Sequence, residues 1–268
     1  MAYKMIVLDL DGTLTNSKKE ITPRTYEALM EAQKKGIVVV LASGRPTYGI
    51  MPLAKQLKLA EYGGYILAYN GGKIMDCKSG DTVFNQELCP DLVPMLYDEA
   101  MKAGVQILTY QGDGIAATKA DDEYVEHEAF INKMPVVEYS DFKNQVEYPI
   151  NKCLIVGDPE PLHKLELKLA AEMEGKISVY RSAPFFLECV PLCIEKSQSI
   201  DKLIKTIGIK QEEVIAVGDG YNDMGMIQYA GLGVAMANAE EEVKAAANYV
   251  TLSNEEDGVA VVVEKFIK

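Results

Sequence analysis

Two aspartates one residue apart, Asp9 and Asp11, follow an apolar run near the start of the sequence, in the stretch LDLDGTLT. Because successive side chains of an extended segment alternate sides, both carboxylates are expected to point the same way, and Leu10 between them the other way. Gly12 permits a sharp turn directly after them. Two like charges aimed at one spot at the end of a buried strand need a cation, and oxygen ligands of this kind favour Mg²⁺.

This stretch has two other interpretations. Asp9, Asp11 and Glu20 match the first, third and twelfth positions of an EF-hand calcium loop. That interpretation fails because Leu14 stands where the loop needs glycine, and because a strand rather than a helix is expected before the run. A solvated acidic turn stays open on these residues alone, since Asp and Gly commonly fill turns.

A second polar group, Ser43-Gly44-Arg45, follows the apolar run IVVVLA. Ser43 offers a hydroxyl, Gly44 lets backbone amides approach an anion, and Arg45 offers a fork of hydrogen-bond donors. The same residues are equally compatible with a helix N-cap followed by a surface arginine.

A third group lies in GDGYND, where Asp219, Asn222 and Asp223 follow the run EEVIAV. A dinucleotide-binding loop is disfavoured because Asp223 replaces the third glycine of G-x-G-x-x-G, and acidic side chains repel a pyrophosphate. Lys196, in CIEKSQS, is able to neutralise the carboxylates and a phosphate together, although a lone lysine is more often a surface charge.

The elements that position these groups alternate between strand and helix. Apolar strands with helices between them indicate an α/β fold with a Rossmann-like parallel sheet covered on both faces, and the carboxyl ends of such strands are where ligands bind. The expected strands of this sheet are KMIVLDL, GIVVVLASG, YILAY, EEVIAVGDG, GLGVAM and NYVTL. The expected helices are residues 23–35, 51–59, a helix ending near 230, 240–247 and one closing the chain.

The pattern changes in the middle of the chain. There, GVQILTY, GDGIAAT, CLIVG and ISVYRS are expected strands, separated by two acidic amphipathic helical stretches. This texture predicts an inserted α+β domain over residues 84–186, with residues 1–83 and 187–268 forming the core.

Composition limits the classes of partner and the compartment. A net charge of −13 disfavours nucleic acid, because binding a polyanion relies on Lys and Arg. The start is apolar for too few residues to be a signal peptide, and no later stretch reaches membrane-span length, so a cytoplasmic protein with no membrane partner is expected. We expect a monomer or a weak homodimer. The odd number of cysteines argues against a complete disulfide framework: Cys77, Cys89, Cys153, Cys189 and Cys193.

In their order along the chain, four of these features resemble the motifs of haloacid dehalogenase-like phosphatases. They are DxDGTLT from Asp9, Ser43-Gly44-Arg45, Lys196, and GDxxND from Gly218 to Asp223. YNGGKI, NEEDGVA and the insert itself resemble the Cof-type class IIB with a large cap domain. EYVEHEAF, SAPFFLE and YAGLGVAMANA resemble YidA-like sugar phosphatases. Ser197 departs from the pattern, since the family usually has glycine after the lysine.

The resemblance implies a Mg²⁺-dependent phosphatase that acts on a small phosphorylated metabolite in two steps. Asp9 attacks phosphorus, and Asp11 protonates the leaving alcohol and then activates water. The metal ligands it implies are the Asp9 carboxylate, the Asp11 backbone carbonyl and Asp219, with Asp223 in support. The phosphate-binding groups it implies are the Leu10 and Gly44 amides, Ser43, Asn222 and Lys196, with Arg45 and Asn70 as further substrate-binding candidates.

The sequence leaves the organic part of the substrate open. His127 is able to contact a sugar but fits a surface or hinge position equally, and Phe185 and Phe186 fit a core. Hexose phosphates, smaller phosphorylated acids, and flavin or pyridoxal precursors are all compatible. A phosphomutase and a non-catalytic protein that binds phosphorylated metabolites are the alternative functions.

Overall fold

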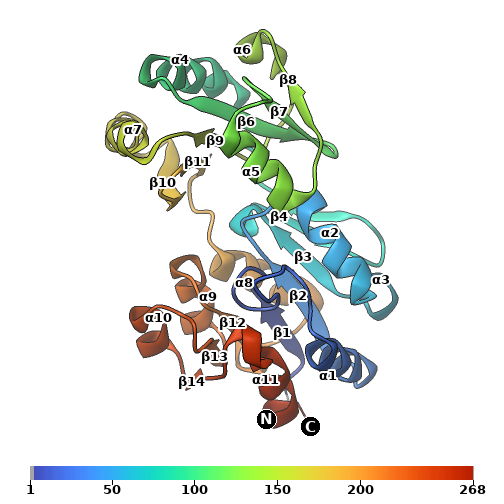
Figure 1. The fold of residues 1–268 in the computed structure, drawn as a ribbon. Coiled ribbons are helices and arrows are strands. Elements are labelled where there is room, and N and C mark those ends of the chain that lie inside the picture. Colours follow the sequence, from blue (N-terminus) through green and yellow to red (C-terminus); the bar gives the residue numbers. More distant parts are fainter. Residues whose placement is uncertain (1–2, 268) are drawn as a thin grey trace. The chain divides into compact units, whose positions relative to one another are not determined.

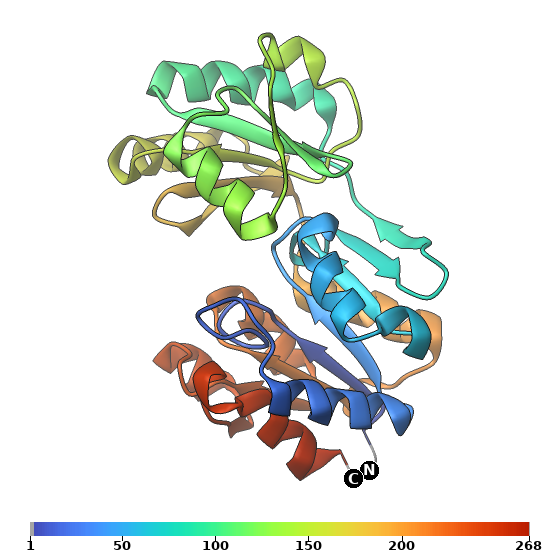
Figure 2. The same ribbon diagram turned by 45° about the vertical axis from the view of Figure 1, so that its right-hand side comes forward.

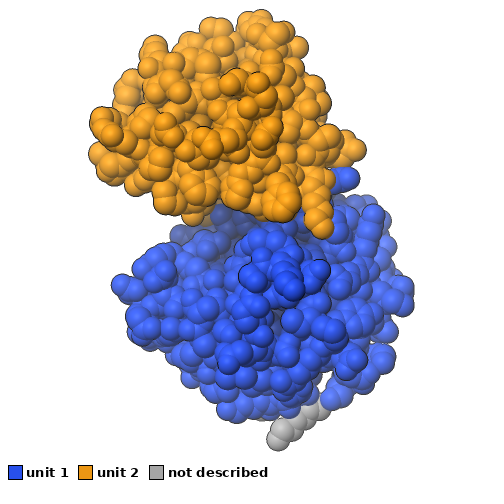
Figure 3. Space-filling view, viewed as in Figure 1, with its two compact units in different colours: residues 1–84, 195–268 blue, residues 85–194 orange. Residues whose placement is uncertain are grey.

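The structure is a computed structural model that describes residues 3–267 and divides into two compact units, coloured separately in Figure 3. Unit 1 combines the chain up to Phe84 with the chain from Glu195 onward, and unit 2 is Asn85–Ile194. The second unit is therefore an insertion between two halves of the first.

Unit 1 is built on an eight-stranded sheet of order β14-β13-β12-β1-β2-β3-β4-β5 (Figure 1). The strands from β14 to β3 are parallel to their neighbours, whereas β4 runs antiparallel to β3. Strand β1 lies between β12 and β2, so both of its edges are hydrogen-bonded. The strands are β1 (Met5–Leu8), β2 (Val38–Ala42), β3 (Tyr65–Ala68), β4 (Lys73–Asp76), β5 (Thr82–Asn85), β12 (Val214–Gly218), β13 (Leu232–Ala235) and β14 (Tyr249–Val250).

The central strands are apolar at every position because each of their faces is covered. Ile6 and Leu8 of β1 belong to one hydrophobic cluster, while Met5 and Val7 belong to another. Alternation along the strand sends successive side chains into the two clusters, which is why the run reads as continuously hydrophobic.

Helices of both halves of the chain cover the two faces. The first cluster contains side chains of α1, α2, α3 and α11, and α1 lies against α11, as Figures 1 and 2 show. The second cluster contains side chains of α8 and α9. The helices are α1 (Pro23–Lys34), α2 (Thr47–Gln56), α3 (Leu59–Tyr62), α8 (Lys196–Ile207), α9 (Met224–Tyr229), α10 (Glu241–Ala246) and α11 (Gly258–Phe266).

Unit 2 has its own six-stranded sheet of order β10-β11-β9-β6-β7-β8. Neighbouring strands are antiparallel except for β7 and β8, which are parallel. The strands are β6 (Gln106–Gln111), β7 (Gly114–Ala117), β8 (Val136–Glu138), β9 (Cys153–Val156), β10 (Ile177–Ala183) and β11 (Phe186–Pro191).

The hydrophobic core of unit 2 lies between this sheet and side chains of α4, α6 and α7. On the β6 strand Ile107 belongs to that core, while the hydroxyl of Tyr110 donates a hydrogen bond to Glu128 of α5. Helix α5 therefore contacts side chains of the sheet that lie outside the main core. The helices are α4 (Val93–Ala103), α5 (Glu123–Asn132), α6 (Phe142–Gln145) and α7 (Pro159–Glu172).

The expected fold class, a parallel-sheet α/β core with an inserted α+β domain, is confirmed. The boundary expected at residues 186 and 187 differs from the structure, in which unit 2 continues to Ile194. The difference arises because Phe186–Pro191 forms β11, which pairs with β9 and β10 of the inserted sheet. The extension of the core sheet by β4, which is antiparallel to β3, and by β5 was not expected. Across residues 3–267, none of the helices is both long and apolar enough to pass through a bilayer.

The central position of β1 gives a stability prediction. Val7 is fully buried on β1, whereas Val250 on the edge strand β14 is 43% exposed. Val7→Ala is expected to lower the free energy of unfolding by about 2 kcal/mol or more, because it removes buried methyl groups and leaves a cavity. Val250→Ala, the matched control, is expected to change it by less than about 0.5 kcal/mol. Denaturant unfolding of the full chain measures both, and equal losses would contradict the assignment of β1 to the core.

Candidate active site

The polar groups singled out in the sequence lie at one edge of the unit 1 sheet. Asp9 follows β1, Ser43 follows β2, Asp219 follows β12, and Asn70 lies in a short 3-10 helix after β3. Because these four strands are parallel neighbours, their carboxyl ends meet at the same edge. The sheet order therefore brings together side chains that are far apart in the sequence.

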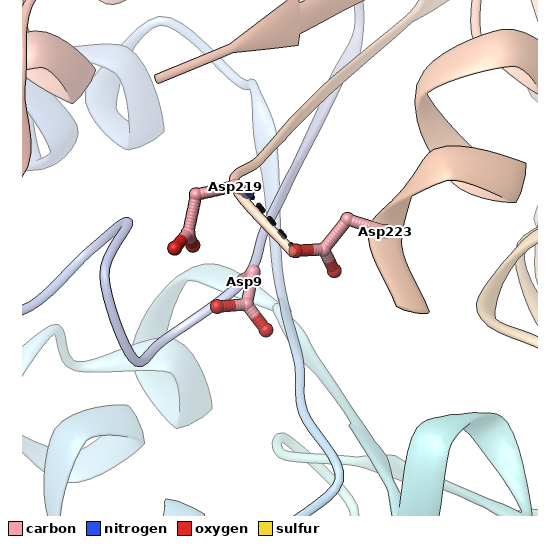
Figure 4. Close-up of side chains that lie close together, drawn as sticks. All are labelled: Asp9, Asp219 and Asp223. Atoms are coloured by element: carbon pink, nitrogen blue, oxygen red, sulfur yellow. Dashed lines mark hydrogen bonds between the residues drawn. The ribbon is translucent and has the colours of Figure 1, made fainter. Parts of the chain in front are cut away.

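Three carboxylates and one ammonium form the centre of this edge. Ligand oxygens of Asp9, Asp219 and Asp223 all lie within 4.8 Å of one another (Figure 4). The Nζ of Lys196, the first residue of α8, lies 2.6 Å from Asp9 Oδ1 and 2.6 Å from Asp223 Oδ1. Asp9 and Lys196 are buried, which excludes both the solvated acidic turn and the surface lysine.

Backbone contacts hold the GDGYND loop around Asp223. The amides of Asp219 and Gly220 each donate a hydrogen bond of 3.0 Å to Asp223 Oδ2, and Figure 4 shows the first of these. One Asp223 oxygen is thus held by the loop backbone and the other by Lys196. Gly218 is required here, because a Cβ at that position would lie 2.4 Å from the Cβ of Asp223.

The electrostatics of the cluster show an excess of negative charge. Burial raises the pKa of Asp9 well above its ordinary value; the neighbouring Asp223 charge raises it further, and Lys196 offsets only part of this. Burial likewise raises the pKa of Asp219 to about 6. Burial disfavours the ammonium form of Lys196, but the charges of Asp223 and Asp9 outweigh it and leave the pKa of the lysine raised.

The donor set fits a hard divalent cation. Carboxylate oxygens are the ligands that Mg²⁺ prefers, and a cation between Asp9, Asp219 and Asp223 would supply the positive charge that Lys196 alone does not. The cluster is a candidate metal site for that reason. The role expected for the Asp11 backbone carbonyl as a further ligand stays a prediction.

The carboxylate of Asp11 has different partners from that of Asp9. Arg45 binds it through two hydrogen bonds, Nε to Oδ2 at 2.8 Å and Nη2 to Oδ1 at 2.6 Å, and Lys19 Nζ lies 2.7 Å from Oδ1. Burial opposes ionisation, but these two cations outweigh it and hold the pKa of Asp11 below its ordinary value. Asp11 is therefore a carboxylate in this arrangement.

The remaining predicted groups surround this centre. The Oγ of Ser43, a buried residue, accepts a hydrogen bond of 3.2 Å from the Arg45 amide. Asn222 Nδ2 donates to Asn70 Oδ1 at 3.2 Å, and a Cβ on Gly44 would approach the Asn70 side chain to 3.2 Å. Gly44 after β2, Asn70 after β3 and Asn222 in the GDGYND loop are thus near neighbours.

The two alternatives left open for SGRP do not hold. Helix α2 begins at Thr47, and the residue at its N-cap position is Pro46, not Ser43. The Arg45 side chain is only 10% exposed, so it is not a surface arginine. Ser43 and Arg45 instead lie at the carboxyl edge of the sheet, with the other site residues.

Sequence reasoning assigned no role to two residues that contact the site. Thr13 Oγ1 donates a hydrogen bond of 2.7 Å to Asp219 Oδ1, and Lys19 pairs with Asp11. Thr13 stands inside the quoted DxDGTLT motif, which was a usable signal. Lys19 lies in a polar stretch with no distinguishing pattern. Leu10 is buried, and its carbonyl accepts from the amides of Thr13 and Thr15, while a role for its own amide toward phosphate stays a prediction.

Comparisons of sequence place the chain among known hydrolases. The profile of the haloacid dehalogenase-like hydrolase family matches residues 6–263. The candidate phosphatase YxeH of Bacillus subtilis (strain 168) is 33% identical over 270 residues, which cover 99% of this chain and 98% of that protein. From the same organism, 5-amino-6-(5-phospho-D-ribitylamino)uracil phosphatase YcsE is 30% identical over 264 residues, covering 98% of this chain and 96% of that protein.

Solved structures agree over the same length. A haloacid dehalogenase-like hydrolase from Bacteroides thetaiotaomicron has a TM-score of 0.96 and 53% identity, covering 98% of this chain and 99% of that one. The subclass IIB sugar phosphatase BT4131 has a TM-score of 0.81 and 26% identity, with 98% of each chain covered. The family match and the two relatives span both units. The chain therefore belongs to the haloacid dehalogenase-like hydrolases, as a Cof-type, class IIB member.

Proposed function

We propose that this chain is a Mg²⁺-dependent phosphatase that hydrolyses small phosphorylated metabolites, sugar phosphates first among them, through an aspartyl-phosphate. The observation that carries the proposal is the buried cluster at the sheet edge, in which Asp9 lies within ligand distance of two further carboxylates and 2.6 Å from the Lys196 ammonium. A buried carboxylate beside a metal site and a fixed cation is suited to attack a phosphate whose charge both neutralise.

The proposed reaction has two displacements at phosphorus. In the first, an Asp9 oxygen forms a bond to phosphorus, the ester P–O bond breaks, and the leaving alcohol oxygen takes a proton from Asp11. In the second, water forms the new P–O bond, Asp11 takes its proton, and the bond from Asp9 to phosphorus breaks. The products are the alcohol and inorganic phosphate, and Asp9 is regenerated.

The contacts of Asp11 add a condition to its role in the first displacement. Arg45 and Lys19 hold it ionised, which suits a base but not an acid. Asp11 must therefore lose one of these cations or gain a proton before it protonates a leaving group. Substrate binding would release Asp11 from Arg45, because the phosphate of the substrate competes with Asp11 for the guanidinium.

Lys196, Ser43 and Asn222 are the side chains proposed to bind the transferring phosphoryl oxygens, together with the amides of Leu10 and Gly44. Catalysis of phosphoryl transfer is largely positioning and charge stabilisation, so donors fixed by surrounding structure are favourable. Ser43 and Lys196 meet this requirement because both are buried. Arg45 and Asn70 are proposed as further substrate contacts.

Mg²⁺ is the proposed cofactor, held by Asp9 and Asp219 with Asp223 in support. When bound, the ion neutralises charge on the carboxylates and on the phosphate and orients both. The buried, mutually repelling carboxylates need this charge before a dianionic phosphate can enter.

Unit 2 is proposed to act as a cap domain that contacts the organic part of the substrate. The site residues of unit 1 are proposed to bind phosphate and metal. Such contacts are common to all phosphomonoesters and do little to discriminate between them. The named activities of similar proteins range from a sugar phosphatase to a ribitylaminouracil phosphatase, so the choice of metabolite is a property of each chain.

A screen of phosphorylated metabolites with Mg²⁺ tests the proposal as a whole. It should include hexose phosphates, smaller phosphorylated acids and flavin or pyridoxal precursors, with release of inorganic phosphate as the readout. Phosphate release with sugar phosphates preferred supports the proposal. Formation of an isomeric phosphoester without phosphate release identifies a phosphomutase, and binding without turnover identifies a non-catalytic protein.

Replacing the nucleophile should separate catalysis from folding. Asp9→Asn is expected to lower kcat to less than about a hundredth of the wild-type value, because an amide does not form the acyl phosphate. Its folded structure should persist, because the amide has nearly the same volume and Lys196 keeps Asp223 as its partner. Steady-state kinetics and circular dichroism check both points. Asp81→Asn, on an exposed residue of unit 1, is the control and should keep full activity; comparable activity in both variants would remove the covalent step from the mechanism.

The raised pKa of Asp219, about 6, gives a pH prediction for the metal-free protein. The folded state binds this proton more tightly than the unfolded state, so the free energy of unfolding should fall as pH rises from about 4 to about 6. Mg²⁺ binds the ionised carboxylates and should reverse the loss. Its stabilising effect, measured as the rise in Tm, is expected to be larger at about pH 7.5 than at about pH 5. Equal shifts at both pH values, or a full effect in Asp219→Asn, would refute the assignment.

A further inference from the structure

We propose that Asn238 and Asn254 are positioning residues that tie the loop after Asp9 to the loop of Asp219, and so hold the two carboxylates at metal-binding spacing. The inference rests on the proposed function, because it assigns these residues a role in that same metal site. Neither residue was singled out individually in the sequence, and both act by holding groups of other residues.

Asn238 makes the first half of the link. It lies between β13 and α10, and its Nδ2 donates a hydrogen bond of 2.8 Å to the carbonyl of Gly12. The same nitrogen lies 3.5 Å from Asp219 Oδ2. One amide group therefore contacts both the loop that carries the nucleophile and the carboxylate of the metal loop.

Asn254 makes the second half. Its backbone amide donates to Asn238 Oδ1 at 3.1 Å, which orients the Asn238 side chain with its Nδ2 toward Gly12. Its own Nδ2 donates to the carbonyl of Thr15 at 2.9 Å. The two asparagines thus bind the loop after Asp9 at two carbonyls, those of Gly12 in the turn and Thr15 directly after it.

The residues after Asn254 extend the same contact. Glu255 Oε1 accepts from the Ser17 amide at 2.6 Å, and Asp257 Oδ1 accepts a hydrogen bond from the hydroxyl of Thr22, the N-cap residue of α1. The segment NEEDGVA, which was identified in the sequence only by resemblance, therefore helps to hold the loop between β1 and α1. This observation gives the motif a physical role.

The site needs such a link because repulsion between its carboxylates favours their separation. Asp9 and Asp219 repel each other, and the loops that carry them approach so closely that a Cβ on Gly12 would lie 2.2 Å from Asp219 Oδ2. Besides the asparagines, the Thr13 side chain also joins the two loops, through its hydrogen bond of 2.7 Å to Asp219. A metal site with loosely held ligands binds its ion more weakly, because the ligands must be ordered on binding.

The test compares Asn238→Ala, Asn254→Ala and the double variant with the unsubstituted chain. Titration calorimetry with Mg²⁺ alone, without substrate, measures Kd directly, and a phosphatase assay gives KM and kcat at saturating Mg²⁺. Each single variant is expected to raise the Kd for Mg²⁺ by about fivefold, the worth of one ordinary hydrogen bond. KM for the phosphoester should change by less than about twofold, since neither residue contacts phosphate in the proposal. The double variant should be weaker than either single variant but by less than the product of their effects, because the two residues form one connected link.

Asn248→Ala is the matched control. Asn248 Oδ1 accepts a hydrogen bond of 2.7 Å from the Gly233 amide, so this variant removes a bond of the same kind in the same unit but away from the carboxylates. It should lower Tm without changing the Kd for Mg²⁺. A Kd unchanged in both site variants, or raised equally in Asn248→Ala, would overturn the proposal while leaving the proposed function intact. Failure of the unsubstituted chain to bind Mg²⁺ would instead contradict the metal assignment itself, and this proposal with it.

Discussion

The buried ammonium of Lys196 is the interaction on which the rest of the site depends. It lies between Asp9 and Asp223 with almost no exposure to solvent, and a third carboxylate, that of Asp219, lies beside them. Burying ions is costly, and a buried ion pair adds little stability compared with apolar packing of the same volume. The cluster therefore adds little stability of its own, and the metal-free fold must be stabilised elsewhere. The central parallel sheet supplies that stability, because its apolar strands are covered on both faces and end at one edge.

The fold was predictable to the extent that its patterns are local. The strands before Asp9, Ser43 and Asp219 were expected because continuous apolar runs ending in polar turns are typical of parallel sheets. The boundary expected from the sequence placed residues 187–191, most of β11, in the core, whereas the structure places them in unit 2. A fully buried apolar strand fits either unit, and only its pairing with β9 and β10 decides. That pairing is a long-range property that composition does not encode.

In the candidate site too, residues in local motifs were predictable, whereas long-range contacts were not. Asp9, Asp219, Asp223 and Lys196 were expected together, because two carboxylates after a buried strand require cations and the motifs follow their family order. The pairing of Asp11 with Lys19 was not expected, since a lysine in a polar loop has no periodic pattern to mark it. Asn238 and Gly12 are in contact although they lie 226 residues apart, and an exposed asparagine gives no signal of its partner. Positioning residues are difficult to predict for this reason: their function lies in the tertiary contact rather than in their own chemistry.

The central claim is that Asp9 carries the phosphoryl group during turnover. Acid quenching of the enzyme during hydrolysis of p-nitrophenyl phosphate in the presence of Mg²⁺, followed by peptide mass spectrometry, tests it most directly. The account predicts a phosphoryl group on the peptide that contains Asp9, labile to hydroxylamine as an acyl phosphate should be, and absent from Asp9→Asn. Steady turnover with an unmodified Asp9 peptide at every quench time, or a phosphoryl group on a different residue, would contradict it.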